Sequence, residues 1–354
     1  YREEALFSGG DFLPGGCLQN GLGMSGTRIL VTGGAGYIGS HTVRLLREQG
    51  YDVWIYDNLS VGHAEAVAGR QLIVGDLADR TTLHAAFEQQ QFAAVVHFAG
   101  VASVGESMRE PLLYYRQNVA NTLALLEVMA RHQVRKLVVS SSCTIYGIPT
   151  ETPILETSVP NPVSPYGRSK LIIEWMLEDC AAAWGLGFVA LRYFNAAGAQ
   201  RDGTLGEDHT PESHLIPLAL QVAAGQRPHL DLFGTDYPTP DGSCIRDYVH
   251  VEDLARAHLA ALEHIQPGEK LFCNLATGRG WSVKEVVRLC EQVTGLGIRT
   301  IEQPRRPGDP PHLVAAVNTA RTVLGWEPRY VDLREIIETA WHWHRTHPRG
   351  YSHS

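Results

Sequence analysis

The chain of 354 residues is long enough for one large or two medium domains with a sizeable buried core. Its net charge of −8 argues against a nucleic-acid-binding protein, because phosphate contacts need a basic surface. No apolar run approaches the roughly 20 residues of a membrane span, and the six cysteines form no CxxC pair. We therefore expect reduced thiols and a cytoplasmic protein that does not bind membranes.

The first 23 residues differ from the rest of the chain. They are rich in glycine, begin with charged residues and lack a continuous apolar stretch, so they do not resemble a signal peptide. Because Met24 followed by Ser25 resembles a natural start, we interpret residues 1–23 as a leader or a cloning remnant outside the fold.

From Arg28 onward, short β-rich runs alternate with helical stretches. The expected strands are apolar nearly throughout, as strands buried on both faces should be. They are Arg28–Thr32, Asp52–Asp57, Gln71–Gly75, Ala94–Ala99, Lys136–Ser141 and Phe188–Tyr193. The expected helices include Tyr37–Gln49, Pro111–His132 and Pro165–Trp184. This alternation predicts an α/β fold with a Rossmann-like, doubly wound parallel sheet.

The character of the sequence changes after Asn195, where turns become frequent and the expected elements are shorter and mixed. We therefore predict a first domain over residues 24–195 and a smaller mixed α/β domain over residues 196–354. The segment 248–262 is expected to pack back on the first domain in part.

A glycine-rich turn directly follows the first expected strand and opens the first helix. Its glycines, Gly33, Gly36 and Gly39, have the GxxGxxG spacing. They allow a tight turn and the close approach of a pyrophosphate, which the helix N-terminus then faces with free N–H groups. Tyr37 and Ile38 lie in the same turn, so we expect them at the cofactor as well.

Asp57 ends the second expected strand, 18 residues after Gly39. A carboxylate there accepts hydrogen bonds from the adenosine ribose and repels a 2′-phosphate, and the next residue is Asn58 rather than arginine. The cofactor is therefore expected to be NAD and not NADP. Further cofactor contacts are expected at the ends of later strands, from Asp76, Leu77, Phe98, Ala99, Gly100 and Tyr193.

A YxxxK motif stands at the start of the helix that begins at Pro165, with Ser164 as its expected N-cap. Tyr166 and Lys170 are four residues apart and share one helix face. A nearby ammonium favours the phenolate, so we expect Tyr166 to act as a general base. Ser142, at the end of the fifth strand, is expected to donate to the substrate oxygen and to help hold Tyr166.

Together these motifs resemble the extended short-chain dehydrogenase/reductase family. From about Arg28 to Tyr351 the chain is similar in particular to its UDP-glucose 4-epimerase group. The segments that carry the resemblance are Val31–Ser40, His97–Ser107, Ser140–Gly147, Ser164–Lys170, Leu191–Gly198, Phe233–Pro238, Asp241–Leu254 and Arg305–Asp309.

The resemblance implies that UDP-glucose and UDP-galactose are interconverted by oxidation at C4, rotation of the 4-keto sugar and hydride return from a tightly held NAD. Tyr166 and Ser142 would act on the sugar 4-hydroxyl, and Lys170 would bind the nicotinamide ribose. It also implies a homodimer built from two helices per subunit, Pro111–His132 and Pro165–Trp184. The positions that match the UDP-sugar side are Phe194, Asn195, His214, Leu215, Phe233, Arg246, Arg306, Asp309 and Leu313.

Two positions depart from the bacterial pattern of this group. Ala102 stands where a lysine is often found, so another group must supply any charge that this lysine contributes. Leu313 stands where some members have a tyrosine that closes the sugar pocket. A smaller residue there accompanies acceptance of N-acetylated sugars, which keeps a side activity on UDP-N-acetylhexosamines open.

Particular residues bear on the alternative functions. A UDP-glucuronate 4-epimerase or decarboxylase stays open, whereas a 4,6-dehydratase needs an acid–base pair where Cys143 and Thr144 stand. A non-catalytic NAD-sensing regulator would not need the YxxxK motif that this chain retains. No metal site is expected, because His344 and His347 of the tail are joined by no further ligands and zinc needs three or four.

Overall fold

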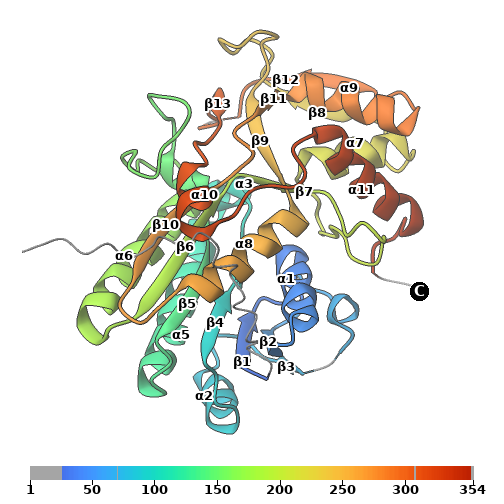
Figure 1. Cartoon of the computed structure of the whole chain (residues 1–354). Helices are drawn as coiled ribbons and strands as arrows, with labels where there is room; N and C mark the ends of the chain where they lie inside the picture. Colours follow the sequence, from blue (N-terminus) through green and yellow to red (C-terminus); the bar gives the residue numbers. More distant parts are fainter. Residues whose placement is uncertain (1–25, 70, 307, 352–354) are drawn as a thin grey trace, which may run out of the picture.

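The structure of the chain is a computed structural model that describes residues 26–69, 71–306 and 308–351 (Figure 1). The segment interpreted as a leader, residues 1–23, lies outside the described residues.

A seven-stranded sheet forms the centre of the larger part of the molecule, with the strand order β3-β2-β1-β4-β5-β6-β10. All of its neighbouring strands run parallel. Its strands are β1 (Arg28–Thr32), β2 (Asp52–Asp57), β3 (Leu72–Val74), β4 (Ala94–His97), β5 (Lys136–Ser142), β6 (Gly187–Tyr193) and β10 (Lys270–Leu275). The predicted doubly wound, Rossmann-like fold is confirmed.

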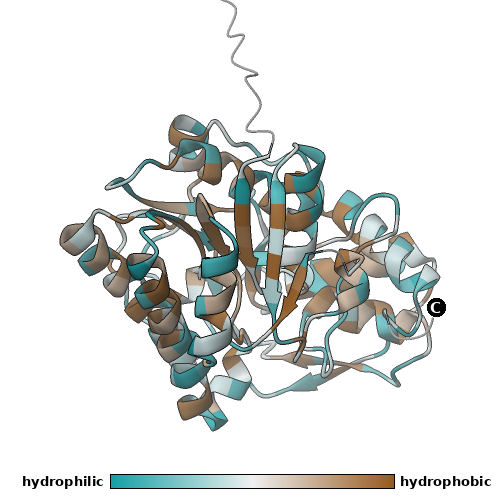
Figure 2. Ribbon diagram, turned by 90° about the horizontal axis from the view of Figure 1, so that it is seen from below, coloured by the Kyte–Doolittle hydropathy of each residue, from teal (hydrophilic) through white to brown (hydrophobic). Residues whose placement is uncertain are grey.

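Helices cover both faces of this sheet (Figures 1 and 2). Helix α1 (Tyr37–Glu48) packs against α8 (Val251–His264) on one face, and α2 (Arg80–Gln89), α5 (Asn121–Arg131) and α6 (Pro165–Trp184) pack together on the other. Many residues of the central strands are coloured as hydrophobic in Figure 2, and their side chains belong to the main buried core. The strands are apolar along their length because both faces are covered.

Two of the expected helices show how local signals set an element's ends. Helix α6 has the predicted bounds: the Ser164 hydroxyl accepts a hydrogen bond from the Gly167 N–H at 3.1 Å, and Gly185 ends the helix with φ of +73°. The stretch expected as one helix over Pro111–His132 is instead interrupted. It consists of α4 (Pro111–Tyr114), a π-helical stretch (Tyr115–Ala120) and α5, preceded by the short α3 (Val104–Arg109).

The C-terminal half contains two smaller sheets and a second hydrophobic core. The strands β7 (Asn195–Ala197), β9 (Ile245–His250), β11 (Gly280–Ser282) and β13 (His312–Leu313) form one sheet, and β8 (Leu230–Phe233) pairs with β12 (Thr300–Gln303). The helices of this half include α7 (Leu215–Ala223), α9 (Val283–Thr294), α10 (Asn318–Leu324) and α11 (Leu333–Thr346).

The chain returns to the large sheet after β9. Helix α8 packs on α1, and β10 joins the edge of the sheet beside β6, followed later by α10 against β10. The large sheet therefore includes residues well beyond 195, and a division of the chain at that residue stays a prediction.

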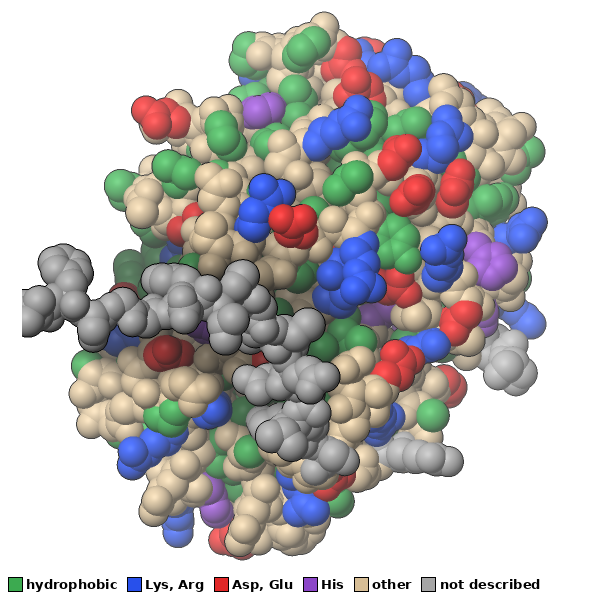
Figure 3. Space-filling model, viewed as in Figure 1, with side chains coloured by type: hydrophobic (Ala, Val, Ile, Leu, Met, Phe, Trp, Pro, Cys, Tyr) green, Lys and Arg blue, Asp and Glu red, His purple; other side chains and the backbone are tan. Residues whose placement is uncertain are grey.

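One face of the molecule shows how its charged side chains are distributed. Acidic and basic side chains are interspersed over the face shown in Figure 3. Of the helices in the described part of the chain, none has both the length and the apolar character needed to cross a bilayer.

Candidate active site

The turn between β1 and α1 lies against the end of β4, where the order of strands in the sheet reverses. Gly33 has φ of +71°, and a Cβ atom placed on it would lie 2.5 Å from the backbone nitrogen of Ala99. A Cβ on Gly39 would lie 2.3 Å from the Gly33 carbonyl oxygen. Gly36 is the N-cap and has no side chain to occupy the first N–H groups of the helix. These features fit a pyrophosphate held by the backbone, as NAD requires.

The close contact at Gly33 leads to a testable expectation. Gly33→Ala should lower the free energy of unfolding by about 2–5 kcal/mol, since left-handed strain and overpacking add, and should reduce the NAD retained by purified protein. Gly295→Ala is a matched control, because Gly295 has the same φ of +71° with no atom within 4 Å of the added Cβ. Urea unfolding and assay of released nucleotide would measure both effects. Equal losses in the two variants would contradict the role of the close contact.

Asp57 braces the glycine-rich turn from the neighbouring strand. Its Oδ2 atom accepts the Ala35 N–H and its Oδ1 atom accepts the Leu59 N–H, each at 2.9 Å. Burial raises the pKa of this carboxyl group. Both carboxylate oxygens have further lone pairs, so Asp57 can still accept hydrogen bonds from the ribose hydroxyls expected here.

The other predicted cofactor residues gather around the ends of the strands. The Asn58 amide donates to Asp76 Oδ2 at 2.8 Å, which places these two side chains together beyond β2 and β3. The Tyr193 hydroxyl makes a short hydrogen bond with the Ser140 hydroxyl. Leu77 is buried, and the Phe98 ring packs on the His258 ring at 4.5 Å.

The three predicted catalytic side chains come together at the ends of β5 and α6. Tyr166, Lys170 and Ser142 are all buried, with exposed fractions of 7%, 6% and 6%. The Lys170 Nζ atom lies 5.9 Å from the centre of the Tyr166 ring and donates to the Ser140 carbonyl at 2.9 Å. The Ser142 hydroxyl accepts hydrogen bonds from the Thr144 N–H at 3.2 Å and the Thr144 hydroxyl at 2.9 Å, and its proximity lowers the pKa of the Tyr166 phenol in part.

The sequence analysis expected the nearby Lys170 ammonium to favour the Tyr166 phenolate, but the pKa of Tyr166 is raised in this structure. Burial raises the pKa of the Tyr166 phenol, and the nearby Ser142 hydroxyl offsets only part of that effect. Burial also lowers the pKa of the Lys170 amine to about 8. Among the protein's own groups, loss of water around the phenolate therefore decides the direction in which the Tyr166 pKa shifts. A further positive charge in the site would favour the phenolate.

Asn118 links the loop after β4 to the catalytic helix, and the sequence analysis missed it. Its amide donates to Ser169 Oγ at 2.9 Å and to the Val101 carbonyl at 3.0 Å, and its Oδ1 atom accepts the Val101 N–H at 2.9 Å. Ser169 directly precedes Lys170, so these bonds set the position of the lysine relative to the sheet. A polar residue on the buried side of an amphipathic stretch is the signal that could have identified it.

The sequence analysis also missed an ion pair close to the end of β5, where Ser142 lies. Glu174 and Arg192 form two hydrogen bonds, at 2.9 and 2.6 Å, with side chains only 2% and 6% exposed. The Glu174 carboxylate also accepts the Ser141 hydroxyl at 2.7 Å. This pair joins α6, β5 and β6 next to Ser142.

Several predicted substrate residues lie together in the C-terminal half. The Arg306 guanidinium stacks on the Phe233 ring at 3.9 Å, and Arg246 pairs with Asp309. Leu313 is paired with Arg246 in the register of β13 and β9. This arrangement offers two guanidinium groups, one exposed and one buried.

The remaining predicted substrate residues lie elsewhere. Phe194 is buried directly after β6, and Asn195 pairs with Tyr248 in the register of β7 and β9. Leu215 begins α7. The half-exposed His214 side chain contacts Glu207 and Glu212.

Comparison with known proteins places the chain in a family. A profile described as the NAD dependent epimerase/dehydratase family matches residues 29–274. This chain belongs to that family. The matched residues include the glycine-rich turn and the Tyr166 helix, and residues 306–313 lie beyond them.

Individual members of the NAD dependent epimerase/dehydratase family resemble the chain over nearly its whole length. A UDP-glucose 4-epimerase of Halalkalibacterium halodurans is 52% identical over 92% of this chain and 97% of its own. The structure of UDP-glucose 4-epimerase from Bifidobacterium longum in complex with NAD+ and UDP has a TM-score of 0.88 and 39% identity, covering 92% of this chain and all of that one. The UDP-Glc/GlcNAc 4-epimerase of Campylobacter jejuni has a TM-score of 0.79 and 42% identity, covering 91% and 100%.

Proposed function

We propose that this protein interconverts UDP-glucose and UDP-galactose by NAD-mediated oxidation and reduction at C4 of the sugar. The observation that carries the proposal is the convergence of Tyr166, Lys170 and Ser142 at the end of β5. This convergence occurs in a chain with relatives of about 50% identity named UDP-glucose 4-epimerase. NAD, when bound, supplies a hydride acceptor that can return the hydride. The glycine-rich turn and Asp57 would hold its pyrophosphate and ribose.

The side chains of the catalytic group divide the proton transfer between them. Tyr166 takes the proton of the 4-hydroxyl as its phenolate and returns it when the sugar is reduced again. Ser142, whose hydroxyl oxygen accepts hydrogen bonds from Thr144, donates its one hydroxyl proton to the same sugar oxygen. Lys170 stays close to the phenolate as a buried ammonium fixed by the Ser140 carbonyl, and its positive charge stabilises the phenolate.

The substrate diphosphate would be bound by arginine. Arg246 and Arg306 each carry a planar guanidinium that can hold phosphate oxygens with two hydrogen bonds. Phe233 lies under Arg306 and offers an apolar face beside it. These local arginines suit an anionic ligand even though the chain carries a net charge of −8.

The decisive test is conversion of UDP-galactose to UDP-glucose by the purified full chain, with and without added NAD. The proposal requires an equilibrium mixture of the two sugars with no net NADH. UDP-N-acetylgalactosamine and UDP-glucuronate should be tested in parallel, because Leu313 is buried beside Arg246 and is smaller than tyrosine. Failure on UDP-galactose with turnover of another UDP-sugar would overturn the assignment.

We also propose a cytoplasmic homodimer formed by helices α5 and α6. Trp175 of α6 and Leu123 of α5 are 55% and 44% exposed, and Leu112 of α4 is 73% exposed. Large apolar side chains on neighbouring helices favour a protein contact. Sedimentation of the full chain would measure the mass.

A further inference from the structure

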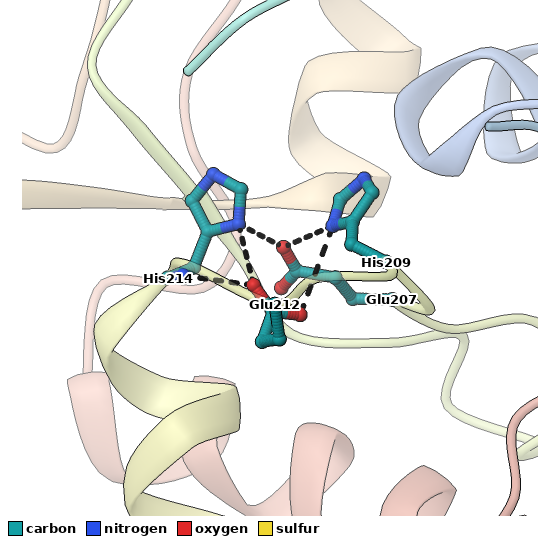
Figure 4. A group of neighbouring side chains, drawn as sticks. All are labelled: Glu207, His209, Glu212 and His214. Carbon is teal, nitrogen blue, oxygen red and sulfur yellow. Dashed lines mark hydrogen bonds and ion pairs between the residues drawn. The ribbon is translucent and has the colours of Figure 1, made fainter. Parts of the chain in front are cut away.

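Four ionisable side chains converge on one point in the connection between β7 and α7. They are Glu207, His209, Glu212 and His214, and we call them the Glu–His cluster (Figure 4). One ligand atom from each residue lies within 4.8 Å of all the others. Figure 4 shows that both imidazole rings turn a nitrogen toward the two carboxylates. All four residues come from one segment of eight residues, 207–214.

The distances within the Glu–His cluster lie on both sides of the separation between the ligands of one small metal ion, and the shorter ones are also hydrogen-bond lengths. The His214 Nδ1 atom lies 2.8 Å from Glu207 Oε1 and 2.9 Å from Glu212 Oε1. The His209 Nδ1 atom lies 3.2 Å from Glu207 Oε1 and 3.7 Å from Glu212 Oε2. A tetrahedral zinc ion, bonded to nitrogen and oxygen at about 2.0–2.1 Å, places its ligand atoms about 3.3 Å apart.

The environment of these atoms also favours a cation. The side chains of Glu207 and Glu212 are only 4% and 5% exposed. Within the described residues, their ion pairs are made with His209 and His214 and not with a lysine or arginine. Two buried carboxylates this close need positive charge between them, which the two imidazoles can supply when protonated and which a divalent cation would supply in their place.

His209 provides an independent observation. Its Nδ1 atom is completely buried and makes no well-directed hydrogen bond, although it is aimed at the Glu207 carboxylate. Its ion-pair contacts with Glu207 and Glu212, at 3.2 and 3.7 Å, lack hydrogen-bond geometry, and a buried imidazole nitrogen in that state is costly in a folded protein. A metal ion between the nitrogen and the carboxylates would satisfy it.

The Glu–His cluster is held in place by its surroundings. The Glu212 Oε1 atom accepts the backbone N–H groups of Ser213 and His214 at 2.6 and 2.8 Å. The Tyr37 ring meets the His209 ring edge-on at 6.2 Å, and the Trp343 indole donates to the Glu207 carbonyl at 3.2 Å. Contacts of this kind orient ligands before a metal binds. They also connect the segment to α1 and to α11.

We propose that the Glu–His cluster binds one zinc ion, with two imidazole and two carboxylate ligands. Four protein ligands fill a tetrahedral site and leave no position for substrate, so the role of the ion is structural. It fastens the connection before α7 between the cofactor-binding helix α1 and the C-terminal helix α11. The sequence analysis expected no metal, because it considered only the two histidines of the tail.

The first experiment measures zinc on the wild-type full chain. Protein stripped with a chelator should bind one Zn²⁺ per chain in a calorimetric titration, and its midpoint of thermal unfolding should rise with Zn²⁺ but not with equal Mg²⁺. Mass spectrometry of metal content after dialysis gives the stoichiometry directly. Absence of stoichiometric zinc binding, or an equal response to Mg²⁺, would mean that the four residues form only a hydrogen-bonded network, and the proposal would fail.

The second experiment assigns the ligands. His209→Gln and Glu212→Gln should each weaken Zn²⁺ binding by more than about 100-fold, since even residues behind the ligands are worth 10–100-fold. His229→Gln is the matched control, because His229 also lies beside a carboxylate, Asp231, at 3.6 Å, but outside the cluster. Unchanged zinc affinity in both cluster variants would place the ion elsewhere and overturn the assignment. The binding readout is independent of sugar turnover.

Discussion

Replacing Tyr166 by phenylalanine should lower kcat for UDP-galactose conversion by at least about 100-fold, since a positioned general base contributes about 10²–10⁴-fold. The change removes the oxygen that exchanges a proton with the sugar and leaves the ring in place. The Tyr166 ring meets the Tyr114 ring at 6.1 Å, and this packing does not involve the hydroxyl. The variant should therefore stay folded and bind UDP within a few-fold of the wild-type affinity.

Tyr114→Phe is the matched control for this experiment, because it removes a neighbouring buried hydroxyl. That hydroxyl donates to Glu106 and accepts the Ser103 N–H, so both of its partners lie in the segment just before Tyr114. Its loss should affect stability more than kcat. Steady-state kinetics with UDP binding by calorimetry separates the two effects. Wild-type turnover by Tyr166→Phe would remove this tyrosine from the mechanism.

The parts of the fold that the sequence predicted well are those set by local signals. Strands β1 and β2 and helix α6 have the predicted bounds, because uniform burial and an N-cap serine with proline leave clear patterns. The return of the chain through α8 and β10 to the large sheet was foreseen only in part. That return depends on contacts between residues far apart in the chain.

The candidate site shows the same division between local and distant signals. The glycine spacing and the YxxxK motif are local patterns with a direct chemical meaning, so they could be identified without coordinates. Asn118 and Glu174 act through partners 51 and 18 residues away, and no spacing indicates such pairs. The Glu–His cluster is local, but its meaning depends on the inward turn of four side chains that the sequence does not specify.

Glu174→Ala should lower the free energy of unfolding by about 3–5 kcal/mol, the usual cost of removing one partner of a buried ion pair. The Arg192 guanidinium would then stay buried with its charge uncompensated. It also donates to the Tyr146 hydroxyl at 2.9 Å and lies 4.6 Å from the Phe272 ring, so it cannot turn toward water without breaking these contacts. Urea unfolding measured by circular dichroism would give the difference.

Glu178→Ala is the control on the same helix. Glu178 lies one turn further along α6 and is exposed, so its loss should change the free energy of unfolding by less than about 0.5 kcal/mol. A double variant, Glu174→Leu with Arg192→Met, tests the cause: if the uncompensated charge is the damage, removing both charges should recover most of the loss. A double variant as unstable as Glu174→Ala would instead assign the loss to the hydrogen bond from Ser141 and to packing. In that case the Glu174–Arg192 pair stabilises the fold mainly by fixing the end of β5 through Ser141, the residue before Ser142.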